Sequence, residues 1–434
     1  MTTRRRVEQV TSEMEGRVIG YRRDLHRYAE AAWTEFRTSS LVARRLVNLG
    51  YDVQSGRQVL RDEARMGLPS LDILEQHWQR ALEQGADLEY LEVVRGGFTG
   101  VVGVLDNGPG PVVGLRFDMD SVDISERQDS GHRPFREGFA SVNDGASHAC
   151  GHDGHTAIGL GVAEVLMALR DQVRGTVKLI FQPAEEGVRG GKAMVSAGVV
   201  DDVDYVLGNH LYSGWKLGEI DPGRSDYLAT TKFDAVITGA PAHAGGRPHE
   251  GKNALLAAST AVLNLHAIPR HKDGVTRINV GKLVAGSGRN VVCSDAHLTA
   301  ETRGCTSGLN DYMYGYAMRV LEAAASMHDC RLEVRAMGSA QSASSDTELA
   351  DRVRELALDI GSFSPRPPET GGGSEDFTYM MERVQQHGGQ ATSIGIGADL
   401  GGWGHHTPEF DFDERALGLS IRLLSEITID LLEG

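Results

Sequence analysis

The chain has 434 residues, of which 40% are hydrophobic and 24% charged, and this length predicts a globular protein with at least two domains. The formal net charge of −16 excludes nucleic acid and anionic membranes as expected partners. Only four cysteines are present and no run approaches the ~20 apolar residues of a membrane span, so we expect a reducing, cytoplasmic location.

The first half of the chain has the pattern of an α/β domain. Residues 1–26 lack the apolar core of a signal peptide and are typical of an amphipathic helix. Apolar runs at 112–117, 177–181 and 205–209 predict buried strands, and helical spacing at 156–170 lies between the first two. This order predicts a mixed, largely parallel sheet, whose sites lie beyond the carboxyl ends of its strands.

After residue 225 the pattern changes to that of a second domain. Strands are predicted at 232–238, 276–284, 296–303 and 331–336, and helices at 251–266 and 310–327. This order predicts a compact α+β (ferredoxin-like) domain at 229–338 that is inserted into the α/β domain. Residues 338–345 are expected to be the return linker, and helices at 346–361 and 414–432 complete a catalytic domain made of residues 1–228 and 339–434.

The stretch HACGHDGH at 148–155 concentrates residues of metal-ligand type. Cys150 and His152 are separated by a glycine, and a turn could direct a thiolate and an imidazole to one divalent ion such as Zn²⁺. The helix predicted to follow should lower the pKa of the thiol, and Asp153 could cap that helix or orient a histidine. The alternative is a polar histidine-rich loop with an inert buried cysteine.

Glu185 and Glu186 follow directly after the second predicted strand, within QPAEEG. Neighbouring side chains of an extended segment point in opposite directions, so one carboxylate could bind a metal while the other faces a water molecule. A carboxylate beside a metal-activated water is the general base of metal-assisted hydrolysis. A solvated acidic turn is the alternative for an isolated pair of this kind.

Histidines occupy two further positions of the same kind. His210 lies at the end of the third predicted strand, and His405 and His406 lie in a glycine-rich loop before Thr-Pro. Each alone could be structural, but together with the earlier motifs they predict one site built from several strand ends. Thiol catalysis, with Cys150 as nucleophile and a histidine as base, uses fewer of these residues.

Taken together, these motifs resemble the amidohydrolase subfamily of the aminoacylase/carboxypeptidase metallopeptidase family. The resemblance rests on HACGHDGH, QPAEEG, His210, His-Thr-Pro at 406–408, RFDMDSVD at 116–123, AHAGGRPHEGKNALLAA at 242–258, GSGRNVV at 286–292, ETRG at 301–304 and GSEDF at 373–377. These segments cover nearly the whole chain.

The resemblance implies two divalent metal ions per subunit, Mn²⁺ or Zn²⁺. It implies that their ligands are Cys150, which bridges both ions, His152, Glu186, His210 and His406. Glu185 would be the general base that takes a proton from the attacking water and delivers it to the departing nitrogen, and Asp120 would orient a ligand.

The resemblance also assigns roles to the inserted domain, as a lid or dimerisation domain. His243 would polarise the scissile carbonyl, from its own chain or from a partner subunit. Asn290 and Arg303 would contact a substrate carboxylate, for which a guanidinium is suited because it pairs with both oxygens. For Arg303, a surface salt bridge at a strand end is the alternative.

The segments 66–92, 229–235 and 410–414 narrow the resemblance to the branch that hydrolyses p-aminobenzoyl-glutamate, a folate breakdown product. We therefore expect hydrolysis of N-acyl amino acids, with this compound as the favoured substrate and hippurate-type or N-acetyl compounds as alternatives. The expected assembly is a homodimer or a heterodimer with a related B subunit. A catalytically silent regulatory subunit or a metal-binding protein would not need Glu185 beside intact ligands.

Segment 66–92 carries Leu71, Leu74, Trp78 and Leu82 at helical spacing. This spacing favours packing on the α/β domain or closure of the substrate pocket.

Overall fold

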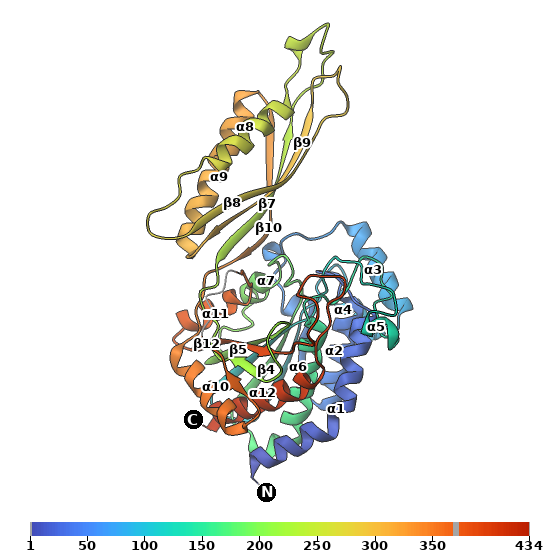
Figure 1. The fold of residues 1–434 in the computed structure, drawn as a ribbon, viewed down its shortest axis with the longest axis vertical. Coiled ribbons are helices and arrows are strands. Elements are labelled where there is room, and N and C mark those ends of the chain that lie inside the picture. The colour runs from blue at the N-terminus through green and yellow to red at the C-terminus, as the bar shows by residue number, and fades with distance from the viewer. Residues whose placement is uncertain (1, 368–372, 434) are drawn as a thin grey trace. The chain divides into compact units, whose positions relative to one another are not determined.

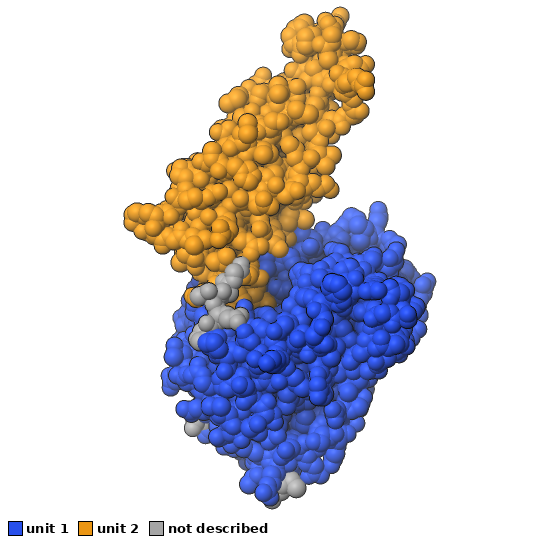
Figure 2. Space-filling view, in the orientation of Figure 1, with its two compact units in different colours: residues 1–225, 344–371, 376–434 blue, residues 226–343, 372–375 orange. Residues whose placement is uncertain are grey.

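The computed structural model describes residues 2–367 and 373–433 (Figure 1). The chain folds into two compact units, coloured separately in Figure 2. Unit 1 contains residues 1–225, 344–371 and 376–434, and unit 2 contains residues 226–343 and 372–375. The second unit is therefore an insertion in the first.

Unit 1 is built on an eight-stranded sheet of order β1-β2-β4-β3-β5-β12-β6-β11. The strands are β1 (Asp52–Ser55), β2 (Val101–Asp106), β3 (Val112–Asp118), β4 (Thr176–Gln182), β5 (Tyr205–Tyr212), β6 (Glu219–Asp221), β11 (Ser364–Pro365) and β12 (Gln390–Gly397). The central pairs β4-β3, β3-β5 and β5-β12 are parallel, whereas β1-β2, β2-β4 and β12-β6 are antiparallel. The predicted mixed, largely parallel sheet is confirmed.

Helices cover both faces of this sheet. The helices of unit 1 are α1 (Thr3–Arg27), α2 (Phe36–Leu49), α3 (Leu71–Glu83), α4 (Leu88–Val93), α5 (Arg133–Arg136), α6 (His152–Ala168), α7 (Gly191–Ser196), α10 (Thr347–Ile360), α11 (Thr378–Gln386) and α12 (Arg415–Glu433). Leu207 and Leu211 of β5 share a core with α6, whereas Gly208 faces Phe377, the residue before α11. Alternate residues of a strand point to opposite faces, so α6 and α11 lie on opposite sides of the sheet.

α6 is the central helix of unit 1. Fourteen of its 17 residues are buried, because it packs on the sheet while α1 and α12 pack on its outer side (Figure 1). A helix that is apolar around its whole circumference is the expected result of burial on all sides.

Unit 2 is a four-stranded antiparallel sheet of order β10-β7-β9-β8 with two helices on one face. Its elements are β7 (Ala229–Thr238), α8 (Ala254–His266), β8 (Thr276–Ala285), β9 (Asp295–Gly304), α9 (Ser307–Met327) and β10 (Arg331–Ala340). The βαββαβ order and the strand order are those of a ferredoxin-like fold, as the sequence predicts.

Two local predictions were wrong. Residues 338–340 are not linker but the end of β10, because a register shift after Ala336 lets Gly338–Ala340 pair with residues of β7. In addition, α6 begins at His152 and not after the HACGHDGH stretch, since Gly151 adopts a left-handed φ of 89° and starts the helix there. The stripe in segment 66–92 packs only in part: Leu74 and Trp78 are buried, but Leu71 is 77% exposed.

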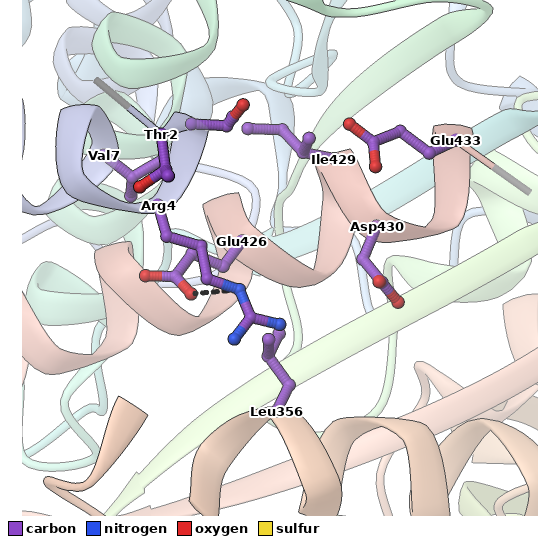
Figure 3. A pocket seen from close by; sticks show the side chains of 9 residues that line it. Thr2, Arg4, Val7, Leu356, Glu426, Ile429, Asp430 and Glu433 are labelled. Atoms are coloured by element: carbon purple, nitrogen blue, oxygen red, sulfur yellow. Dashed lines mark ion pairs between the residues drawn. The ribbon is translucent and has the colours of Figure 1, made fainter. Parts of the chain in front are cut away.

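The first turn of α1 packs beside α12, next to α10 (Figure 3). Thr2, Val7, Leu356 and Ile429 line a hollow there, and Arg4 Nε lies 3.8 Å from Glu426 Oε2. Within the described part of the chain, no helix is both long enough and apolar enough to cross a membrane.

Candidate metal centre

The residues of the predicted site gather at one edge of the unit 1 sheet. Asp120 lies just beyond the end of β3, Glu185 and Glu186 follow β4, and His210 lies near the end of β5. Cys150 and His152 form the turn into α6, and His406 lies in the loop that follows β12. The carboxyl ends of parallel strands meet at this edge, which is where α/β folds place their sites.

Two ligand clusters share one sulfur. In the first, Cys150 Sγ, His152 and His210 offer atoms that all lie within 4.8 Å of one another, and Sγ is 3.5 Å from His210 Nε2. In the second, Cys150 is grouped in the same way with Glu186 and His406, where His406 Nε2 is 3.2 Å from Glu186 Oε1. Thiolate, imidazole and carboxylate in groups of three form the donor set of a divalent transition-metal site.

The imidazole rings are held in the tautomer that a metal ligand needs. His152 Nδ1 lies 2.8 Å from the Asp120 carbonyl, and His210 Nδ1 lies 2.8 Å from the Leu211 carbonyl. A carbonyl only accepts, so both rings donate from Nδ1 and keep a lone pair on Nε2. Burial lowers the pKa of His210 well below its usual range, which favours the neutral ring.

Buried polar atoms in these clusters indicate that a cation belongs there. His152 Nε2 is buried and makes no hydrogen bond within the described residues, and the buried Glu186 Oε1 has only its ion-pair contact with His406. Such orphaned atoms are costly in a protein interior, and coordination to a cation would satisfy them. The residues present therefore fit a divalent metal.

The electrostatics of the site also favour a cation. Burial disfavours a charged His152 ring, but the negative charge of Asp118 outweighs it and raises the pKa of His152 well above its usual range. The cluster thus attracts positive charge, and a divalent ion would supply it in place of a proton.

Asp120 connects three parts of the site. Its two carboxylate oxygens accept the backbone N–H groups of Glu185 and Glu186, each at 2.9 Å, while its carbonyl accepts from His152. Asp120 therefore fixes the loop of the paired glutamates relative to a ligand histidine. Glu185 Oε2 lies 4.0 Å from His152 Nε2.

Two expectations for the first motif were wrong. Cys150 is buried, and burial raises the pKa of its thiol to about 12, whereas we expected the helix terminus to lower it. A thiol with this pKa is almost wholly protonated near neutrality, which weighs against thiol catalysis; a bound metal would deprotonate it. Asp153 neither caps α6 nor contacts a ligand histidine, because it accepts hydrogen bonds from Arg22 Nε and His26 Nδ1 of α1, each at 2.8 Å.

Two buried residues behind the ligands, Asp118 and His155, were not predicted from the sequence. His155 Nδ1 donates to Asp118 Oδ1 at 2.6 Å, and His155 Nε2 accepts the backbone N–H of Leu211 at 2.8 Å. His155 thereby ties the end of β3 to the end of β5 beside His210. Its position three residues after His152, on the same side of a helix, was the available signal.

The structure distinguishes the two adjacent histidines of the late loop. His405 Nε2 accepts the Ser213 N–H at 3.3 Å, and its ring packs 5.0 Å from Phe410. His406 adopts a left-handed φ of 60° and its ring meets Glu186, so His406 and not His405 joins the ligand clusters.

The residues predicted in unit 2 do not lie together. His243 and Asn290 belong to adjoining loops, since the Ala244 N–H donates to the Asn290 carbonyl at 3.0 Å. These loops extend beyond the end of β9 at Asp295, whereas Arg303 is near its other end, so about 26 Å of strand separates them. Arg303 is paired through Nε and Nη2 with Glu301, at 3.0 and 3.2 Å.

A largely parallel α/β unit with two ligand clusters that share one sulfur beside a glutamate, plus an inserted ferredoxin-like unit, is the arrangement expected of a metal-dependent hydrolase. Residues 114–430 match the model of the peptidase family M20/M25/M40, and the chain belongs to this family. It is a hydrolytic enzyme.

Relatives with related names match almost the whole chain. It is 47% identical over 427 residues to the A subunit of the p-aminobenzoyl-glutamate hydrolase of Escherichia coli, covering 98% of both chains. It is 50% identical over 408 residues to the indole-3-acetyl-aspartic acid hydrolase of Enterobacter agglomerans, covering 93% of both. The crystal structure of an aminobenzoyl-glutamate utilization protein from Klebsiella pneumoniae superposes with a TM-score of 0.85 at 40% identity over 98% of each chain.

Proposed function

We propose that this enzyme hydrolyses the amide bond between an aromatic acyl group and an acidic amino acid, with p-aminobenzoyl-glutamate as the preferred substrate. The observation that carries the proposal is the pair of ligand clusters that share Cys150 and adjoin Glu185. The relatives support the substrate class, since the names of both the Escherichia and the Enterobacter enzymes specify an aromatic acyl group joined to glutamate or aspartate.

The proposed ligands for two divalent ions are Cys150, His152, Glu186, His210 and His406. When bound, such ions act as Lewis acids that activate water and polarise a carbonyl. Thiolate and imidazole suit Zn²⁺, while carboxylate and imidazole also suit Mn²⁺.

The protein's own groups move the proton. Glu185 accepts a proton from the water that attacks the amide carbon, and it returns that proton to the amide nitrogen as the C–N bond breaks. Water is thus added across the bond, giving p-aminobenzoate and glutamate. Asp120 holds the glutamate loop in place for this transfer.

His243 is proposed to stabilise the negative charge that develops on the carbonyl oxygen. Its Nδ1 accepts the backbone N–H groups of Gly245 and Gly246, at 3.2 and 3.0 Å. The ring proton therefore lies on Nε2, where it can be donated to an oxyanion.

We further propose a dimeric enzyme in which residues 229–338 form the lid and dimerisation domain and residues 1–228 and 339–434 the catalytic domain. Asn290 and Arg303, proposed substrate-carboxylate contacts, are too far apart within unit 2 to serve one small substrate from one chain, which favours a contribution from a second chain. That chain is an identical copy or a related B subunit, as the name of the Escherichia relative suggests. The four free cysteines suit a reducing, cytoplasmic location.

The test is hydrolysis by the purified chain, stripped of metal and then supplied with Mn²⁺ or Zn²⁺. Its panel contains p-aminobenzoyl-glutamate, indole-3-acetyl-aspartate, hippurate and N-acetyl-glutamate. We expect activity only with metal and the highest kcat/KM for p-aminobenzoyl-glutamate. In Glu185→Gln, bound metal should stay while kcat falls by at least about 10²-fold.

A preference for indole-3-acetyl-aspartate would show that the enzyme has the specificity that the name of the Enterobacter relative states. Because the chain is 50% identical to that relative, hydrolysis of indole-3-acetyl-aspartate is the second candidate function. A preference for hippurate or N-acetyl-glutamate would contradict the proposed aromatic and acidic selectivity. A wild-type kcat in the Glu185→Gln variant would contradict the role of Glu185 as general base.

A further inference from the structure

Arg189 lies three residues after Glu186, in a loop with unusual backbone geometry. Ala184, Gly187 and Val188 all have left-handed φ values, of 53°, 84° and 59°. A β-branched residue such as Val188 rarely adopts this conformation, and such strain persists where the surroundings impose it, often at ligand sites. The loop is closed by hydrogen bonds from the Val188 N–H to the Glu185 carbonyl and from the Arg189 N–H to the Ala184 carbonyl, at 2.6 and 3.1 Å.

This backbone turns the Arg189 side chain back over Gly187, the residue next to Glu186. A Cβ at position 187 would lie 2.5 Å from Arg189 Nε and 3.0 Å from Nη2, so a larger residue there would displace the guanidinium from its present position. Arg189 Nη1 donates to the Gly67 carbonyl at 3.4 Å, and the preceding Met66 carbonyl accepts from Trp33 Nε1 at 2.7 Å. Segment 66–67 and Gly187 therefore hold the guanidinium against the loop that carries the glutamate pair.

The positive charge of Arg189 has no carboxylate partner in the described part of the chain. Its Nε is buried and makes no hydrogen bond there. By contrast, the fully buried Arg22 pairs with Asp153, Asp411 and Glu414. A half-buried cation left unpaired beside a catalytic loop indicates an anion that comes from outside the protein.

We propose that Arg189 binds the side-chain carboxylate of the acidic amino acid in the substrate and so selects N-acyl-glutamate or N-acyl-aspartate over neutral N-acyl amino acids. This inference rests on the proposed function. Such a substrate has two carboxylates, and the resemblance to the family assigns one of them to residues of unit 2, which leaves the second without a binding group. A guanidinium binds a carboxylate through two donors, which suits Arg189 to this task. In this proposal, segment 66–67 has the function of positioning the guanidinium through the Gly67 carbonyl.

The test compares p-aminobenzoyl-glutamate with p-aminobenzoyl-glutamine, which keeps the α-carboxylate but lacks the side-chain charge. In Arg189→Gln, KM for the glutamate compound should rise by about 10- to 100-fold, the range expected for a lost charge-assisted hydrogen bond, with kcat nearly unchanged. Kinetics of the glutamine compound should be unaffected. Arg189→Lys, which keeps charge but not the planar fork, should give an intermediate KM.

Arg95→Gln is the matched control, because Arg95 is an exposed arginine of unit 1 that pairs with Glu75. This variant should have the wild-type kcat and KM for both compounds. An equal loss on both compounds in Arg189→Gln and Arg189→Lys, or no loss on either, would overturn the proposal.

A binding measurement separates this inference from the proposed function. Calorimetric titration of p-aminobenzoyl-glutamate into metal-loaded Glu185→Gln and Glu185→Gln/Arg189→Gln should show a Kd about 10- to 100-fold weaker in the double variant. If wild-type enzyme hydrolyses neither compound but this difference persists, the proposed reaction fails and the carboxylate site stands. If hydrolysis occurs and the two Kd values agree, the reaction stands and Arg189 has no such role.

Discussion

Cys150 is the residue on which the two ligand clusters meet, so its removal tests both at once. In Cys150→Ala, each cluster loses its shared sulfur, and bound metal should fall from about two ions per chain to about one or fewer. Metal analysis of the dialysed protein gives this number. Cys293→Ala, which changes a free cysteine of unit 2, should keep the wild-type content. Full metal occupancy with lost activity in Cys150→Ala would restore the thiol-nucleophile hypothesis.

His26 provides a prediction on the pH dependence of stability. This buried ring contacts Asp153 and Glu126 at 2.8 and 2.9 Å and faces Arg22 and the ring of His148. Burial and Arg22 disfavour its charged form, but the two carboxylates outweigh them and raise the pKa of His26 to about 9.

A pKa raised above the unfolded value of about 6.5 means that the folded state binds the proton more tightly. The resulting stabilisation, about 3 kcal/mol, is complete below pH 6.5 and disappears as the pH rises through 9. The free energy of unfolding in urea should therefore fall between pH 7 and 10 in the wild type and much less in His26→Gln. The exposed His387→Gln is the control, and a parallel fall in all three proteins would contradict the assignment.

At the scale of single residues, chemistry was easier to predict than environment. Cysteine, histidine and glutamate motifs identified the residues that the clusters contain, because ligand types are a property of the side chains themselves. The partner of Asp153 and the direction of the Cys150 pKa depend on α1 and on burial by distant segments, which no local pattern contains.

Helix α6, which begins with His152, packs closely on the sheet because it has glycines at the contact. A Cβ at Gly159 would lie 2.7 Å from ring atoms of both Phe117 and Phe181, which are fully buried on β3 and β4. Gly159→Ala should therefore destabilise unit 1 by about 1–3 kcal/mol, although alanine favours a helix.

Gly20 is the matched position on α1, since nothing lies within 4 Å of a Cβ placed there. Gly20→Ala should instead stabilise the protein by up to about 1 kcal/mol. Urea unfolding of both variants measures the difference. If both substitutions raised the free energy of unfolding equally, α6 would not be closely packed on the sheet.

At the scale of elements, the buried central strands β3, β4 and β5 were predictable because continuous apolar runs have few other interpretations. The start of α6 and the end of β10 were not, since the first depends on the left-handed conformation of Gly151 and the second on a register shift after Ala336. In the region of helices α3 and α4, the sequence shows only apolar residues at helical spacing. This spacing does not predict which of those residues are buried, and Leu71 is in fact exposed.

At the scale of the whole molecule, the sequence predicts an inserted α+β domain because its strand pattern interrupts the α/β pattern. Sequence patterns alone do not reveal that the three residues predicted to contact substrate, His243, Asn290 and Arg303, are split within that unit. His243 and Asn290 lie beyond one end of β9, and Arg303 lies near the other, about 26 Å away. One substrate cannot meet both ends of the same unit, so in an active dimer His243 should serve the site of the partner chain.

Complementation between two inactive variants tests this arrangement. Glu185→Gln lacks the base, and His243→Ala lacks the proposed oxyanion donor, so each homodimer should be nearly inactive. In a mixed dimer, the site with intact Glu185 would receive His243 from the other chain. If equal amounts are dissociated and reassembled at random, half of the dimers are mixed and each has one complete site, so activity should recover to about a quarter of the wild-type value. No recovery, with mixed dimers demonstrated by differently tagged chains, would show that His243 acts on its own chain or not at all.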